Sequence, residues 1–176
     1  MELRLVRTAH PGVADVDVRM MERAIALARQ AALAGEVPIA AVVYRGNEVL
    51  GEAANTRERE ADPTGHAEIV AMREAGRRIG EWRLEGCSMA VTLEPCPMCA
   101  GAMVNARLAR LVYGATDPKA GACETLYAIP GDARLNHRVA MHGGVLADRC
   151  AELLRAFFRE RRAMQKAAKD AARRSA

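Results

Sequence analysis

Apolar residues in the first quarter of the chain follow a helical spacing and then a strand-like one. The helical set recurs every three or four positions, at Met21, Ala24, Ile25, Ala28 and Ala32. Asp17 is a candidate N-cap for this helix, and Gly35 can end it. Residues 37–44 and 49–55 are then rich in valine, isoleucine and alanine around the turn-forming residues 45–47. This pattern predicts a helix followed by a β-hairpin.

The rest of the chain alternates between the two kinds of element. Helices are predicted over residues 66–78, 97–107 and from 147 onward, and strands over 88–93, 108–115 and 138–142. A hairpin followed by strands that are separated by helices favours one sheet covered on both faces. We therefore expect an α/β protein, a three-layer α/β/α sandwich with a central mixed five-stranded sheet.

The 176 residues fit one compact domain. Residues 1–16 show no sustained period and include His10, Pro11 and Gly12, so we expect a flexible N-terminal extension there. The domain itself is expected over residues 17–166. Residues 167–176 are basic and polar, and we expect this tail to fray.

Composition excludes several classes of protein. No apolar run approaches the roughly 20 residues that a membrane span needs, and charged residues stand where a secretory leader would be apolar. The five cysteines are an odd number in a chain without an export signal, which argues against a disulfide framework. We expect a cytoplasmic protein that does not contact a membrane.

Positive charge is concentrated at one end of the chain. The net charge is +4, but the residues from Arg155 onward include eight basic and two acidic side chains, so this segment carries +6 and the rest −2. Such a segment attracts a phosphate backbone, although a solvated amphipathic helix with no nucleic-acid role can have the same composition.

Cys96 and Cys99 are the first candidates for chemistry. Two thiols three positions apart can reach one metal ion if the second lies on the first turn of a helix. A redox dithiol, half of a structural zinc knot and two buried cysteines are alternative readings of the pair.

Upstream, His66-Ala67-Glu68 supplies an imidazole and, two positions later, a carboxylate that need not bind metal. Alone, His66 could cap its helix and Glu68 could favour the helix N-terminus. Together with the two cysteines, they give three metal ligands and one unliganded acid. A structural zinc site closes with four protein ligands, whereas a catalytic site keeps three and leaves one position for water.

These residues carry a resemblance to a known family. His66-Ala67-Glu68 with the segment Thr92-Leu93-Glu94-Pro95-Cys96-Pro97-Met98-Cys99 resembles the bacterial tRNA-specific adenosine deaminases, within the cytidine deaminase-like zinc superfamily. Further blocks extend the likeness from about residue 21 to about residue 162. They include residues 35–38, 62–64, 82–84, 112–115, 117–119, 136–138 and 157–159.

The resemblance implies a cytidine deaminase-like fold and a hydrolase with one zinc ion per subunit. The ligands would be His66, Cys96 and Cys99, and Glu68 would move protons while adenosine is hydrolysed to inosine. The substrate would be the wobble adenosine in the anticodon loop of a tRNA, where an unpaired base leaves its stack at least cost. Relatives form homodimers, and we expect one here.

The resemblance also implies substrate contacts. Asn55 matches a pocket asparagine that hydrogen-bonds the flipped base, although asparagine is also common in turns. Other positions match residues that surround the anticodon loop: Asp117, Lys119, Asn136, His137, Phe157, Phe158 and Arg159. Phe157 also completes the apolar stripe of the last helix and could belong to the core. Cys87, Cys123 and Cys150 lie outside the metal pattern and are expected to be small apolar fillers.

Some positions depart from the family pattern. Ala40, Gly65 and Tyr113 replace more usual residues without removing a catalytic group, whereas residues 122–134 diverge more and bear on substrate preference. Two other functions fit the zinc motif: deamination of a free base such as guanine or cytosine, and a non-catalytic, zinc-stabilised RNA-binding subunit. The basic tail argues against the first and Glu68 against the second.

Overall fold

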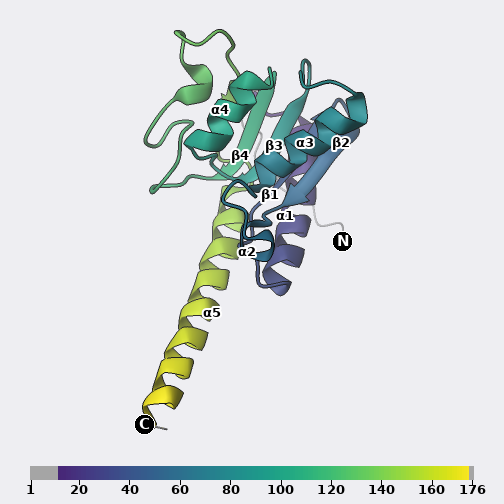
Figure 1. Ribbon diagram of the computed structural model, residues 1–176. Helices are drawn as coiled ribbons and strands as arrows, with labels where there is room; N and C mark the ends of the chain where they lie inside the picture. The colour runs from purple at the N-terminus through teal and green to yellow at the C-terminus, as the bar shows by residue number, and fades with distance from the viewer. Residues whose placement is uncertain (1–11, 175–176) are drawn as a thin grey trace, which may run out of the picture.

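The computed structural model describes residues 12–174 and places a five-stranded sheet at the centre of the molecule (Figure 1). The strands run in the order β2-β1-β3-β4-β5. Their bounds are β1 (Ala40–Arg45), β2 (Glu48–Ala54), β3 (Ser88–Leu93), β4 (Arg110–Ala115) and β5 (Ala140–His142). β1 is antiparallel to β2 and β3, whereas β3, β4 and β5 are parallel, so the sheet is mixed.

Helices cover both faces of this sheet. The long ones are α1 (Asp15–Leu33), α3 (Ala67–Ile79), α4 (Pro97–Asn105) and α5 (Ala147–Arg174). α3 and α4 pack on one face through residues such as Ala71 and Met103, and α1 and α5 on the other through residues such as Ile25 and Cys150. The expected three-layer α/β/α sandwich with a mixed five-stranded sheet is confirmed.

Two glycines in the strands allow the helices to approach closely. A Cβ atom at Gly51 in β2 would overlap the backbone of α3 at Ala71 and Ala75, and one at Gly114 in β4 would overlap the side chain of Cys150 in α5. Both positions therefore need a residue without a side chain, because packed backbone atoms cannot move aside cheaply.

Two short elements were not expected from the sequence. α2 (Arg57–Glu60) lies between the hairpin and α3, and a single 3-10 turn, η1 (Ile129–Gly131), lies in the divergent segment between β4 and β5. Neither is long enough to produce an apolar period, which is the signal used to find the other helices.

The first helix begins earlier than its sequence indicated. Ala14 is its N-cap, and Asp17 is the third residue of the helix, where its buried carboxylate accepts a hydrogen bond from the N–H of that N-cap residue. The Asp17 carboxylate accepts hydrogen bonds from the Ala14 N–H at 2.8 Å, the Tyr44 hydroxyl at 2.5 Å and the Arg110 guanidinium at 2.7 Å. Asp17 therefore joins α1 to β1 and β4, and these two partners lie too far along the sequence to be inferred from local pattern.

The ends of the helices near both termini also differ from the domain bounds expected from the sequence. Residues 1–11 of the expected extension lie outside the described part of the chain, and α1 takes up the last two positions of that extension. At the other end, α5 continues to Arg174, past residue 167 where we expected fraying. Apart from Asp170, the added residues 167–174 are all Ala, Lys or Arg, which are strong helix formers. Within residues 12–174, no helix combines the length and the apolar character that a membrane crossing needs.

We predict that Asp17→Asn lowers the free energy of unfolding at neutral pH by about 2 kcal/mol, the contribution of hydrogen bonds to a buried charge. Burial alone would raise the pKa of Asp17, but the hydrogen bonds from Tyr44, Ala14 and Arg110 outweigh it and hold the pKa below its ordinary value of 3.8. Stability from a lowered carboxyl pKa is present above 3.8 and is lost as the pH falls below it.

The parent and Asp17→Asn should therefore converge in stability at acid pH. Urea unfolding at neutral pH and below pH 3.8 measures the difference. A constant gap between the parent and Asp17→Asn across this range would contradict the assignment.

Candidate metal centre and its surroundings

Two helices begin at the same edge of the sheet, and this places the candidate ligands together. β2 and β3 run in the same direction because each is antiparallel to β1, which lies between them. α3 follows β2 along the chain and α4 follows β3, so both helix N-termini lie beyond the same strand ends. His66 is the N-cap of α3, and Cys96 is the N-cap of α4.

His66, Cys96 and Cys99 form one compact cluster. The Sγ atoms of Cys96 and Cys99 each lie 3.6 Å from Nδ1 of His66, and the three ligand atoms lie within 4.8 Å of one another. Zn–S bonds of ~2.3 Å and a Zn–N bond of ~2.0 Å in a tetrahedron separate sulfur from nitrogen by about 3.5 Å, close to the distances found here. The cluster therefore has the donors and the spacing of a three-ligand zinc site, as the sequence pattern predicted.

Electrostatics prepares these side chains to bind a cation. A hydrogen bond from Cys99 and the neighbouring His66 lower the pKa of Cys96 to about 4, so this sulfur is a thiolate at neutral pH. The same contact with Cys96, together with burial, raises the pKa of Cys99, so the proton between the two sulfurs stays on Cys99. The hydrogen bond with Cys96 also raises the pKa of His66. Metal ligands must be deprotonated, so a bound cation would take the place of these protons.

Glu68 lies beside the cluster without being one of its ligands. It is the second residue of α3 and only 3% exposed, and its Oε2 atom has no hydrogen-bond partner among the described residues. Burial raises the pKa of this carboxyl above its ordinary value. Burying a carboxylate oxygen without a hydrogen-bond partner costs free energy. Such atoms are found at sites that bind a ligand or a reacting group.

Asn55 lies at the end of β2 and contacts the start of α3. Its Oδ1 accepts a hydrogen bond of 2.9 Å from the Ala67 N–H, and its own N–H donates to the Ile39 carbonyl oxygen. This contact fixes the orientation of the side-chain amide next to His66. The Asn55 Nδ2 group makes no hydrogen bond with the described residues, so it remains able to donate to a bound molecule.

Glu94 is a functional residue that the sequence analysis missed. Its buried carboxylate accepts hydrogen bonds from four backbone N–H groups, those of Asp117, Cys123, Glu124 and Thr125, at 2.8–3.1 Å, and one from the Thr125 hydroxyl. Burial alone would raise the pKa of Glu94, but these hydrogen bonds outweigh it and lower the pKa. Glu94 precedes Cys96 by two residues, so it holds the loops at 117 and 123–125 next to the metal ligands.

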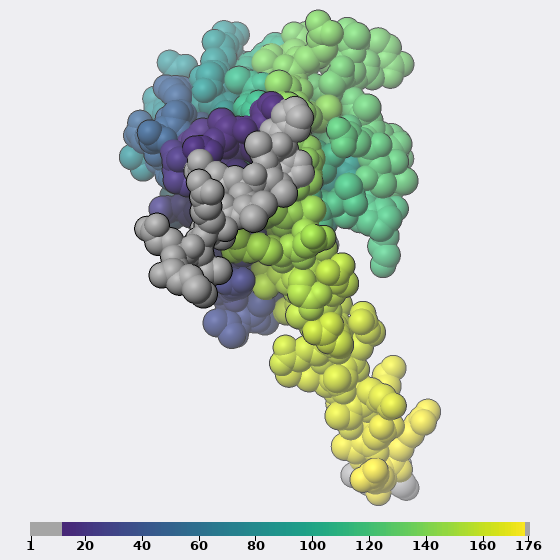
Figure 2. Space-filling model, turned by 180° about the vertical axis from the view of Figure 1, so that it is seen from behind, coloured from purple at the N-terminus to yellow at the C-terminus, as the bar shows by residue number. Residues whose placement is uncertain are grey.

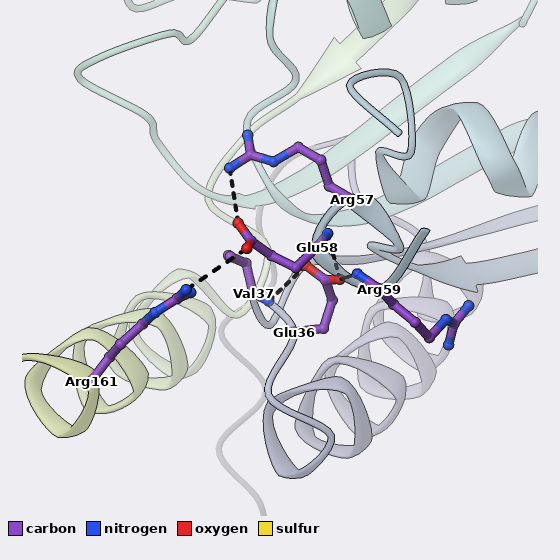
Figure 3. Close-up of polar contacts among 6 residues, drawn as sticks. All are labelled: Glu36, Val37, Arg57, Glu58, Arg59 and Arg161. Carbon is purple, nitrogen blue, oxygen red and sulfur yellow. Dashed lines mark hydrogen bonds and ion pairs between the residues drawn. The ribbon is translucent and has the colours of Figure 1, made fainter. Parts of the chain in front are cut away.

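Glu36 plays a similar part for the loop that leads to His66. Its carboxylate accepts hydrogen bonds from the backbone N–H groups of Glu58 and Arg59 at 3.0 and 3.2 Å, and from that of Val37 at 3.1 Å (Figure 3). Glu36 thereby supplies the N-terminal cap of α2 from a distant part of the chain. Thr56 stands at the N-cap position but does not cap the helix with its side chain.

The predicted RNA contacts fall into separate places. Asp117 and Lys119 lie in the loop held by Glu94, and the Lys119 N–H donates to the Asp117 carboxylate at 2.9 Å. The structure does not bring Asn136 and His137 to the cluster. Asn136 accepts hydrogen bonds from Arg107, and His137 is bonded to the Leu108 carbonyl oxygen, both just beyond the C-terminal end of α4. Cys99 lies in the first turn of that helix, which ends at Asn105, so about 9 Å of helix separates the two places.

Phe157, Phe158 and Arg159 lie on the surface of α5. Phe158 is 41% exposed, Phe157 is half-buried outside both core clusters, and the two rings meet edge to face at 5.4 Å. Arg161 lies over the Phe157 ring. Phe157 is therefore a surface residue of α5 and does not belong to the core, which was the alternative considered for it. The remaining cysteines, at 87, 123 and 150, are at most 1% exposed, as expected of apolar fillers.

Comparison with known proteins agrees with this geometry. A model of the MafB19-like deaminase family matches residues 16–162. A tRNA-specific adenosine deaminase of Bacillus subtilis is 46% identical over 87% of this chain and 95% of its own length. One of Haemophilus influenzae is 41% identical over 86% of this chain and 88% of its own length.

Solved structures give the same result. A chain from structural studies of A-to-I editing by tRNA:A34 deaminases superposes with a TM-score of 0.74 at 40% identity, covering 77% of this chain and 99% of that one. A guanine deaminase of Bacillus subtilis is 35% identical, with a TM-score of 0.54, over 56% of this chain and 63% of that one.

The fold and the cluster at its helix N-termini define the class of cytidine deaminase-like enzymes. Within that class, the chain belongs to the MafB19-like deaminases and, among them, to the family of bacterial tRNA-specific adenosine deaminases.

We predict that Glu94→Gln loosens the loops at 117 and 123–125 while metal binding persists. The amide would turn donor hydrogens toward backbone N–H groups that need an acceptor, which leaves buried donors unsatisfied and costs about 2 kcal/mol. Hydrogen exchange at the amides of Asp117, Glu124 and Thr125 should accelerate. Thr125→Val removes only the hydroxyl contact and should have a smaller effect; unchanged exchange in Glu94→Gln would refute the anchoring role.

We also predict that Cys96→Ala loses bound zinc and melts at a lower temperature than the parent, because metal-binding energy is partly folding energy. Cys123→Ala is the matched control: it removes a buried sulfur outside the cluster and should keep the metal. Metal analysis of both proteins with thermal melts is the measurement. Parent-like zinc content in Cys96→Ala would contradict the ligand assignment.

Proposed function

We propose that this protein hydrolyses the wobble adenosine in the anticodon loop of a tRNA to inosine and releases ammonia. The observation that carries the proposal is the pairing of a three-ligand site, His66, Cys96 and Cys99, with the unpartnered carboxylate oxygen of Glu68. Relatives at 41–46% identity named as tRNA-specific adenosine deaminases support the choice of substrate.

The ligand set fits zinc, and we propose one zinc ion per subunit. When bound, it would lower the pKa of water toward ~7 and so make hydroxide available at neutral pH. Two sulfurs and one imidazole leave one position of a tetrahedron for that water.

Glu68 would carry the protons of the reaction. Its buried carboxylate has an oxygen free to accept a proton from the water, and the raised pKa of the carboxyl favours holding that proton for a time. The same oxygen would then deliver protons to the ring nitrogen and to the departing amino group. Water adds at C6 and ammonia leaves, which balances the conversion of adenosine to inosine.

Asn55 would orient the base. The contact of its Oδ1 with the Ala67 N–H directs the amide nitrogen away from the helix, where it can donate to an acceptor on a flipped purine. The contact of Asn55 with the start of α3 and its proposed pocket role are thus compatible, because they use different atoms of the amide.

The protein surface favours a polymeric substrate. The residues from Arg155 onward carry a net charge of +6. A free base has no phosphates with which this charge could pair, whereas an RNA has many. We propose that Asp117 and Lys119, on the loop held by Glu94, and Phe157, Phe158 and Arg159 on α5 contact the RNA. Asn136 and His137 would contact it only away from the reacting base.

The alternatives are less well supported. The guanine deaminase of Bacillus subtilis is 35% identical over 56% of this chain, whereas the two tRNA-specific adenosine deaminases are 41–46% identical over 86–87% of it. A non-catalytic subunit would have no use for a buried acid with an unpartnered oxygen beside its zinc site. We also propose that the protein forms a homodimer. A second copy would fit the apolar groove of about 830 Å³ between α3 and α4, which lies beside the exposed Trp82. We place the protein in the cytoplasm, where its proposed substrate is used.

The test is incubation of the metal-loaded protein with total tRNA, followed by sequencing for A-to-I changes at the wobble position. We predict that Glu68→Gln abolishes detectable inosine formation, at least a hundredfold loss, because general acid–base catalysis contributes roughly 10²–10⁴-fold. Zinc content should equal that of the parent, since Glu68 is not a ligand.

Glu74→Gln, an exposed acid on the same helix, is the control and should retain full activity. Undiminished inosine in Glu68→Gln would remove Glu68 from the mechanism. Turnover of free guanine by the parent with no change in any tRNA would overturn the proposed substrate.

A further inference from the structure

The C-terminal part of α5 extends away from the body of the protein as a single helix (Figures 1 and 2). Every described residue from Arg162 to Arg174 is exposed. The match to the family model ends at residue 162. We call residues 163–174 the arm; it lies outside the segment that defines the family.

Basic side chains form one row along this helix. They stand at Arg155, Arg159, Arg162, Lys166, Lys169 and Arg173. The steps between them alternate between four and three residues, which keeps all six on one face of a helix. At 1.5 Å per residue the row is about 27 Å long, with a positive charge every ~5 Å. We refer to this set as the basic row.

The outer part of the basic row is free to meet a partner. Near its base, Glu152 lies 3.1 Å from Arg155 and 3.6 Å from Arg159. Arg162, Lys166, Lys169 and Arg173 form no ion pair with any residue in the described range, and Asp170 at the edge of the row does not pair with them. Four unneutralised charges in line are a surface for a repeating anion.

The other faces of the arm do not suit an apolar partner. They carry mainly alanines, with Met164 as the one large apolar side chain among the described residues of the arm. A helix that docks in a protein groove needs large anchors at i, i+3 or i+4, and i+7, and a helix that lies on a membrane needs a face of Leu, Phe or Trp. The charge pattern therefore favours a nucleic-acid backbone.

The part of α5 just before the arm lies against α2, the short helix that precedes His66 along the chain. Arg161 on α5 approaches Glu58 of α2 at 3.8 Å, and Arg57 contacts the same carboxylate at 3.7 Å (Figure 3). α2 lies between Asn55 and His66 along the chain. From Arg161 to Arg174 the helix runs about 20 Å outward. An RNA with a loop base at the cluster would therefore have its paired stem within reach of the arm.

We propose that the basic row on the arm binds the phosphate backbone of the paired stem below the loop that is deaminated. This inference rests on the proposed function and extends it: the loop supplies the reacting base, and Lys166, Lys169 and Arg173 grip the stem. The arm contributes affinity for the RNA and does not act in the chemical step.

The test measures binding of RNA hairpins by fluorescence anisotropy over a range of salt concentrations. One hairpin carries the anticodon loop on a long stem, and the other carries the same loop on a minimal stem. The neutral variant combines Lys166→Ala, Lys169→Ala and Arg173→Ala. Its affinity for the long-stem hairpin should fall at least tenfold, and its salt slope should decrease in magnitude by about 2 to 3, as expected for the loss of three phosphate contacts. Its affinity for the minimal-stem hairpin should not change.

A second variant keeps the charge but moves it to other faces. It adds Met164→Lys, Ala167→Lys and Ala168→Arg to the neutral variant, so the net charge equals that of the parent. We expect its long-stem affinity to stay closer to the neutral variant than to the parent. Recovery to the parent value would show that net charge alone acts, and would overturn the role of the row. Circular dichroism checks that both variants remain helical.

The binding assay separates this inference from the proposed function. Inosine formation at saturating RNA should be unchanged in the neutral variant. Deamination of tRNA without any stem dependence of binding would refute the arm's role alone. Stem-dependent binding without deamination by the parent would refute the proposed function alone. Equal loss of affinity for both hairpins, or loss of binding to anionic vesicles with unchanged RNA binding, would also overturn the inference.

Discussion

The candidate reaction site depends on two helices starting at one edge of the sheet. β1 is inserted between β2 and β3 and runs against both, so these two strands point the same way and the helices that follow them begin side by side. The N-cap positions of α3 and α4 then provide an imidazole and a thiolate, and the first turn of α4 provides the second sulfur. Helix N-termini favour negative charge, which suits thiolate ligands and a nearby carboxylate.

The buried acids of the protein differ in how many hydrogen bonds their oxygens accept. This difference separates the acids with a structural role from the one with a proposed catalytic role. Asp17 and Glu94 accept several hydrogen bonds, and the pKa of each is lowered despite burial. Glu68 is as deeply buried, yet one of its oxygens has no partner and its pKa is raised. The first two fasten segments of the chain together, whereas the third retains the capacity to take up a proton.

Sequence patterns were sufficient for the layers of the fold and for the metal ligands, because apolar periods and ligand spacing are local features. His66 and Cys96 could be paired across 30 residues only because their motif is distinctive. The capping of α2 by Glu36 and the anchoring of loops by Glu94 could not be predicted, since each joins an acid to backbone groups more than 20 residues away. The start of α1 lies three residues before the position expected, because Asp17 acts from the third position of the helix, on the Ala14 N–H, and not as the N-cap itself.

The anchoring by Glu94 has a consequence for how this enzyme can change. Four of its five donors are main-chain N–H groups, which every residue except proline possesses. The exposed side chains of this stretch, such as those of Pro118 and Lys119, can therefore be exchanged while the path of the backbone is preserved. Gly121 is the exception, because a Cβ atom there would overlap the Glu94 carboxylate. If these loops contact the RNA as proposed, selectivity for the nucleotides around the reacting base can be varied on this scaffold without rebuilding the metal site two residues away from Glu94.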